Sequence, residues 1–102
     1  MIVRIWRYRV EEGHRADFER IYGSNGDWAR LFRLADGYLG TQLLRDPLEP
    51  GVYATLDRWR SAADFQAFFT RFGAQYAALD RACDALTVEE SDLGQYEDTD
   101  PG

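Results

Sequence analysis

The feature that most restricts the possible folds of this chain is the order of its hydrophobic patterns, some with the spacing of a strand and others with the spacing of a helix. Three segments have the β-branched and aromatic content of strands, and the first and third also alternate with period two: residues 2–10, 38–45 and 52–60. Residues 14–35 and 61–86 instead repeat apolar side chains at steps of three or four, which predicts helices. A fourth, short strand is expected near residues 93–97. The predicted order is strand, helix, strand, strand, helix, strand.

Turn-forming residues mark the boundaries of these elements. Residues 23–26 interrupt the first helix and divide it in two, with Ser24 as the expected N-cap of the second piece. Gly40 lies inside the second strand, which is typical of a bulge or a close backbone contact. Residues 46–51 have turn chemistry throughout and join the second and third strands into a hairpin. Ser61 is the expected N-cap of the final helix.

The final helix carries the strongest periodic signal, and Gly73 is its expected weak point. Its apolar stripe consists of Phe65, Phe68, Phe69, Phe72, Tyr76, Leu79, Cys83 and Leu86. The helical spacing favours a core interpretation of the four phenylalanines over an aromatic ligand box. Cys83 continues the stripe and is interpreted as a small buried hydrophobic residue.

This order of elements predicts an α+β, ferredoxin-like domain, in which both helices pack on one face of a four-stranded antiparallel sheet. A chain of 102 residues has room for one domain, assigned to residues 1–97, followed by an acidic tail at residues 98–102 that we expect to be disordered. The other sheet face would expose apolar strands to water. Since packing two such sheets face to face covers them, we expect a homodimer.

Composition excludes several classes of function. Residues 1–81 carry twelve bases and eleven acids, so no basic field attracts nucleic acid. No apolar run approaches the ~18 residues of a membrane span. One histidine, His14, and one cysteine, Cys83, predict neither a zinc site nor a disulfide framework. The single cysteine and the lack of a signal-peptide pattern favour a cytoplasmic protein, and without a glycine-rich phosphate loop we expect no bound cofactor.

RNA binding is a rival interpretation, because RNA-recognition motifs share this order of elements and residues 4–9 mix arginine with aromatic rings. The third strand, however, lacks the basic-glycine opening of that motif. Thr55 stands where an aromatic side chain should stack on a base. We therefore do not expect RNA binding.

Several segments resemble the antibiotic biosynthesis monooxygenase domain, a dimeric α/β-barrel. They include the opening MIVRIW and the stretch LDRWRSAADFQAF, in which Trp59, Ser61 and Phe65 match a Trp-x-Ser-x-x-x-Phe pattern of the family. The resemblance extends over residues 1–97. It implies one of two activities: cofactor-independent oxidation of phenolic or quinol substrates with the substrate's own electrons, or degradation of heme.

The heme-degrading branch is identified by an Asn on the first strand and by a Trp and a His on the final helix. At the matching positions this chain has Trp6, Phe68 and, approximately, Ala78. His14 lies in the turn after the first strand and is badly placed to act as the missing ligand. Heme degradation is therefore not expected.

The resemblance also implies a small-molecule pocket between sheet and helices, facing Arg4, Trp6 and Tyr8. An arginine there needs an anion, a carboxylate partner or an aromatic face. Two interpretations stay open: Arg4 forms a core ion pair with Asp57, or Arg4 holds an anionic substrate while Asp57 or a water takes its proton. The rings expected around a flat aromatic substrate are those of Trp6, Tyr8, Trp59, Phe68 and Tyr76.

Two further alternatives remain. Trp59 has a structural interpretation, as a large ring that fills the corner between sheet and helix. The whole domain also has a non-catalytic interpretation, since a fold does not determine a function. A non-catalytic protein that binds a small ligand would be compatible with the same residues.

Overall fold

The computed structural model describes residues 1–100 and confirms the predicted order of elements. In chain order these are β1 (Ile2–Arg9), the 3-10 helix η1 (Glu12–His14), α1 (Arg15–Tyr22), α2 (Asp27–Phe32), β2 (Tyr38–Arg45), β3 (Val52–Trp59), α3 (Ala62–Cys83), the 3-10 helix η2 (Asp84–Leu86) and β4 (Glu89–Glu97). The two pieces α1 and α2 together occupy the position of the first helix.

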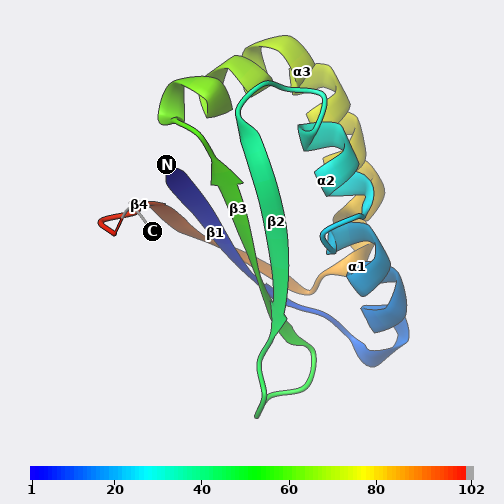
Figure 1. The fold of residues 1–102 in the computed structure, drawn as a ribbon. Helices are drawn as coiled ribbons and strands as arrows, with labels where there is room; N and C mark the ends of the chain where they lie inside the picture. Colours follow the sequence, from blue (N-terminus) through cyan, green and yellow to red (C-terminus); the bar gives the residue numbers. More distant parts are fainter. Residues whose placement is uncertain (101–102) are drawn as a thin grey trace.

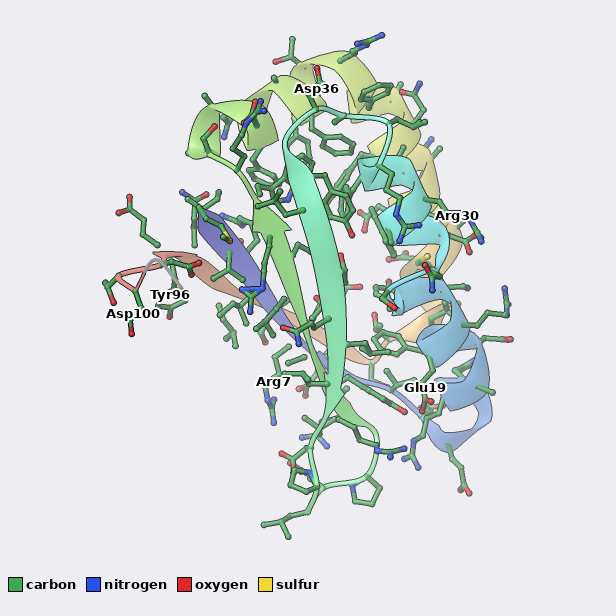
Figure 2. All side chains as sticks on the ribbon, viewed as in Figure 1. Arg7, Glu19, Arg30, Asp36, Tyr96 and Asp100 are labelled. Atoms are coloured by element: carbon green, nitrogen blue, oxygen red, sulfur yellow. The ribbon has the colours of Figure 1, made fainter. Side chains whose placement is uncertain are left out.

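The four strands form one antiparallel sheet in the order β2-β3-β1-β4. All three α-helices lie on one side of it (Figure 1). This is the ferredoxin-like arrangement that the sequence predicts. No other element of residues 1–100 covers the second side, where Arg7 and Tyr96 project in Figure 2. We call this second side the open sheet face; it carries Val3, Ile5, Arg7, Leu44, Ala54, Leu56 and Tyr96.

The core lies between the sheet and the helices and is largely aromatic. Its buried members are Ile2, Tyr8, Val10, Phe18, Tyr22, Trp28, Phe32, Tyr53, Trp59, Phe68 and Cys83. Most neighbouring rings meet at tilted or edge-to-face angles, as Trp59 does with Phe32 at 5.6 Å and with Phe65 at 5.4 Å between centroids, whereas Phe18 and Tyr22 stack at 4.1 Å. Such pairs stabilise a fold by about 0.5–1.5 kcal/mol each beyond the burial of their area.

The start of α2 corrects one prediction. Its N-cap is Gly26, not Ser24, and no side chain caps it. At Gly26 the chain turns so tightly that a Cβ would lie 2.2 Å from the carbonyl oxygen of Ile21, so the position accepts only glycine. In contrast, the predicted cap of α3 is confirmed, since the Ser61 hydroxyl accepts a hydrogen bond from the Asp64 N–H at 3.1 Å.

Two irregularities fall close to the glycines that the sequence singled out. The pairing of β2 with β3 shifts register between Tyr38 and Gly40, and Gly40 has a φ of +139°, which confirms a bulge. Helix α3 contains a kink at Phe72, with φ −117° and ψ 20°, next to Gly73. The weak point of the helix is therefore where the sequence predicted it.

Strand β4 is longer than predicted, since it starts at Glu89 rather than near residue 93. It is an edge strand that pairs with all of β1, from Ile2 opposite Glu97 to Arg9 opposite Glu89. Backbone hydrogen bonds hold it without an apolar pattern.

The predicted tail begins directly after β4. The Asp98 N–H donates to the carbonyl oxygen of Met1 at 3.2 Å, so the tail is held at its start. Residues 101 and 102, which the prediction of disorder also covers, lie outside the described residues. No helix within residues 1–100 is long and apolar enough to cross a membrane.

Candidate functional site

A cavity of about 360 Å³ lies between the helix-facing side of the sheet and the helices. This volume is within the range of ~300–1,000 Å³ that small-molecule sites occupy. Aromatic rings form most of its wall, on strand β1 and on all three helices. The polar side chains of the wall include Arg4, Thr41, Thr55, Asp57, Asp80 and Glu90.

The alternation of β1 explains how the sheet contributes to this wall. Arg4, Trp6 and Tyr8 are two residues apart and all line the cavity, as the resemblance implied. In the antiparallel pairing with β3, Arg4 is opposite Asp57 and Trp6 is opposite Thr55. Side chains of paired residues point to the same face, so β3 contributes Asp57 and Thr55.

Arg4 has a different ionic partner from the one expected. Its Nη2 donates to the carboxylate of Asp92 on β4 at 2.9 Å, so the core ion pair with Asp57, one of the two interpretations left open, does not form. The guanidinium carbon also lies 5.1 Å from the centroid of the Phe65 ring. The Nε of Arg4 is buried and has no hydrogen-bond partner. Because this nitrogen is closed off from open space, a ligand would meet Arg4 at the guanidinium end that Asp92 holds.

Asp57 is the carboxylate that the cavity wall holds away from water. Burial raises its pKa to about 6, although a hydrogen bond from Thr41 and the charge of Arg4 act to lower it. The Thr41 hydroxyl donates to Asp57 Oδ1 at 2.6 Å. A carboxylate with a pKa this close to neutrality can both accept and release a proton at physiological pH.

The tyrosines of the wall are neutral phenols. Burial raises the pKa of Tyr76 to about 12 and that of Tyr8 still further. The hydroxyls of Tyr8 and Thr55 are 3.1 Å apart and share a hydrogen bond. These phenols offer hydrogen bonds and flat surfaces at neutral pH, but no negative charge.

Five of the seven predicted site residues thus surround one cavity: Arg4, Trp6, Tyr8, Asp57 and Tyr76. Trp59 and Phe68 do not line it, being only 0% and 1% exposed within the core. This corrects their predicted contact with a substrate and agrees with the structural interpretation of Trp59. Which of the five act on a ligand stays a prediction.

Sequence reasoning missed a second group of wall residues. Trp28 and Phe32 line the cavity from α2, and Thr41 and Thr55 line it from β2 and β3. The two rings had a signal, since they lie one helical turn apart on the apolar side of a short helix. The two threonines did not, because the alternation of a strand shows which residues share a face but not which face meets the helices.

The heme branch of the family can be tested against the donor atoms of this wall. Neither histidine nor cysteine is among the wall residues. The only histidine, His14, lies in η1, and Cys83 is buried in the core. Residues 1–100 contain no group of three or more His, Cys, Asp and Glu side chains that could hold a metal ion. The wall does not fit a heme whose iron is ligated by imidazole or thiolate.

Comparisons with known proteins agree with this fold. SnoaB of Streptomyces nogalater, a cofactor-independent oxygenase, is 21% identical, with a TM-score of 0.75 over 97% of this chain and 93% of that one. The heme degrader MhuD of Mycobacterium tuberculosis is 25% identical, with a TM-score of 0.67 over 100% of both chains. No curated protein sequence matches the chain. The family model of antibiotic biosynthesis monooxygenases matches residues 1–77. The chain therefore belongs to the antibiotic biosynthesis monooxygenase family.

Proposed function

We propose that this protein is a cofactor-independent monooxygenase that oxidises a small aromatic phenol or quinol in the cavity. The observation that carries the proposal is that Asp57 and Arg4 lie opposite each other on neighbouring strands. A carboxylate with a pKa of about 6 and an arginine thus share one aromatic wall. The description of SnoaB as a cofactor-independent oxygenase supports the same reaction class.

In the proposed reaction, Asp57 accepts a proton from the substrate and the charge of Arg4 stabilises the resulting anion. The anion then reduces O₂. For a ring CH₂ that becomes a carbonyl, four electrons leave the substrate, one oxygen atom stays on the carbon, and the other leaves as water with the two hydrogens. The substrate supplies all the electrons, so the reaction needs no external reductant.

Arg4 is suited to this role because its present partner holds it weakly. The Asp92 side chain is 46% exposed, although that of Arg4 is only 19% exposed, so water competes for this ion pair from the Asp92 side and weakens it. An anionic ligand can therefore compete with Asp92 for the guanidinium end of Arg4 without breaking a strong interaction.

Oxygen consumption with a panel of anthrone- and quinol-type compounds, and with no cofactor added, tests the proposal. We expect uptake by the wild type and a loss of at least about tenfold in Arg4→Met, because roughly 1.4 kcal/mol of anion stabilisation is enough for that factor. The melting temperature should change little, since the Asp92 carboxylate that loses its partner is half exposed and can be hydrated instead. Arg30→Met is the matched control: Arg30 also binds an aspartate at 2.9 Å, but on the outer surface of α2. Wild-type rates in Arg4→Met would contradict the proposed role.

A non-catalytic, ligand-binding protein is the second candidate. The Arg4–Asp92 ion pair favours it, because it already engages the arginine that the proposed reaction requires. In that case the same compounds should quench the fluorescence of Trp6 and Trp28, which both line the cavity. Quenching without oxygen uptake across the whole panel would favour this second candidate.

We further propose that the protein is a homodimer formed through the open sheet face. Leu44 on this face is 47% exposed, and its neighbours across the strands include Ala54 and Leu56. Light scattering should give twice the chain mass of 11.8 kDa. Leu44→Lys should shift the protein towards monomer, whereas Leu48→Lys, in the β2–β3 turn and 91% exposed, should not. A wild-type monomer at micromolar concentration would refute the interface.

A further inference from the structure

While Asp57 is ionised, it is the final acceptor of two successive hydrogen bonds, which run from Tyr38 through Thr41 to Asp57. Only one assignment of donors and acceptors is possible in this chain. Thr41 Oγ1 lies 2.6 Å from Asp57 Oδ1 and 2.6 Å from the hydroxyl of Tyr38. Threonine has a single hydroxyl proton, and the ionised carboxylate can only accept. The Thr41 proton therefore points to Asp57, and Tyr38 must donate to Thr41. Burial raises the pKa of Tyr38, which keeps the phenol protonated for this role.

The bulge in β2 makes this chain possible. In a regular strand, residues three apart point to opposite faces. Here the register shift puts Tyr38 opposite Trp59 and Thr41 opposite Asp57, so both side chains reach the same face. Gly40 absorbs the extra residue with a φ of +139°, a conformation that other residues rarely adopt. The ring of Tyr38 is held at 5.5 Å from Phe32 and 5.3 Å from Trp59.

The chain occupies one oxygen of the carboxylate and leaves the other available. Within residues 1–100, no hydrogen bond reaches Asp57 Oδ2. In the same range, the buried side-chain atoms without a hydrogen-bond partner are Arg4 Nε, Trp28 Nε1 and Trp59 Nε1. Asp57 Oδ2 is not one of them although it has no partner, so this oxygen is in contact with open space. Since Asp57 lines the cavity, that space is the cavity itself.

We propose that Tyr38 and Thr41 are positioning residues, which fix the Asp57 carboxylate with Oδ1 bound and Oδ2 directed at the substrate proton. The inference rests on the proposed function, in which Asp57 is the base. Its physical reason is that an acceptor works only when it is held in line with the proton it takes. A free carboxylate would rotate, and Arg4 could then draw it away from the substrate.

A pH titration of Asp57 isolates the hydroxyl chain, provided that the other groups facing this carboxylate are unchanged. The titratable and charged groups that share the cavity with Asp57, apart from the hydroxyl chain, are Arg4 and Tyr8 on β1, Tyr76 and Asp80 on α3 and Glu90 on β4. The hydrogen bond from Thr41 favours the charged form of Asp57. Its removal must therefore raise the midpoint of the titration.

The experiment follows the ¹³C signals of the aspartate carboxyl groups by NMR as a function of pH. Thr41→Val should raise the Asp57 midpoint by about one pH unit, which corresponds to the loss of one hydrogen bond to a charged group. Thr41→Ser, which keeps the hydroxyl, should restore the wild-type value. Tyr38→Phe should cause a smaller rise, because Thr41 keeps its proton but loses the donor that orients it.

Thr55→Val is the control, because Thr55 also lines the cavity from β3 but bonds Tyr8 rather than Asp57. The Asp57 titration midpoint in Thr55→Val should equal that of the wild type. An unchanged midpoint in Thr41→Val, or an equal rise in Thr41→Ser, would overturn the inference. Tyr38→Phe keeps the test decisive if Thr41→Val does not fold.

The titration needs no substrate, so it fails independently of the proposed function. Midpoints that move as expected, without oxygen uptake by any compound, would refute the oxygenase and leave the hydroxyl chain established. If the wild type consumes oxygen, the acidic limb of its pH–rate profile should move to higher pH in Thr41→Val, by the same amount as the Asp57 midpoint. A profile that stays in place would show that the chain does not serve the reaction.

Discussion

Asp57→Asn should raise the stability of the protein at pH 8 and leave it nearly unchanged at pH 4. The pKa of Asp57 in the folded protein is about 6, against 3.8 for an unperturbed aspartate, chiefly because of burial. The folded state therefore holds this proton more tightly than the unfolded chain. The stability that follows is fully present below pH 3.8 and is lost as the pH rises through 6. A shift of about two units corresponds to roughly 3 kcal/mol.

Urea denaturation at fixed protein concentration measures this effect. At pH 8 the Asn variant should unfold with a free energy about 2–3 kcal/mol higher than that of the wild type, because a neutral amide replaces a buried charge. Its carbonyl oxygen can still accept the Thr41 hydrogen bond. Asp92→Asn serves as the control, since Asp92 is half exposed and should give no comparable gain. Equal stabilities of Asp57→Asn and the wild type at pH 8 would contradict the buried charge.

Trp59→Ala should destabilise the fold by about 3–5 kcal/mol, the usual cost of removing a large ring from a packed core. The ring is 0% exposed and contacts Phe32, Tyr38, Phe65 and Phe68. For a domain of this size the melting temperature should fall by at least about 12 °C. Calorimetry at one protein concentration provides the measurement.

Trp6→Ala is the informative comparison, because Trp6 is only partly buried and lines the cavity. It should cost less stability than Trp59→Ala but reduce ligand binding more. If Trp59→Ala instead kept the wild-type melting temperature and lost ligand binding, the core assignment of Trp59 would be wrong.

The sequence predicted the elements that an apolar pattern defines. The alternation of residues 2–10 located β1, and the stripe from Phe65 to Leu86 located α3. Strand β4 was placed only in part, because its first half consists of polar residues that pair through their backbone. Ser24 is not the cap because the helix starts later, after Gly26, where the backbone lies so close to the Ile21 carbonyl that only glycine fits.

The partial prediction of the site has a related cause. Alternation placed Arg4 and Asp57 on one face, and the structure puts both in the cavity wall. The ionic partner of Arg4 depends on the neighbouring strand, where the pairing of β1 with β4 shifts register between Ile5 and Trp6. The shift lies beside Gly94, which has a φ of +103°; a glycine inside a strand can indicate a bulge, as Gly40 does, but it does not indicate which side chain the bulge brings to Arg4.

The central strands divide their residues between two surfaces. On β3, Thr55 and Asp57 face the cavity, whereas Leu56 between them faces the open sheet side. A substitution at one position can thus alter one surface and leave the other unchanged. An insertion of one residue within the strand would exchange both at once. In descendants of this domain, we expect ligand preference to diverge by point substitution in the strands, and changes of length to accumulate in turns such as residues 46–51.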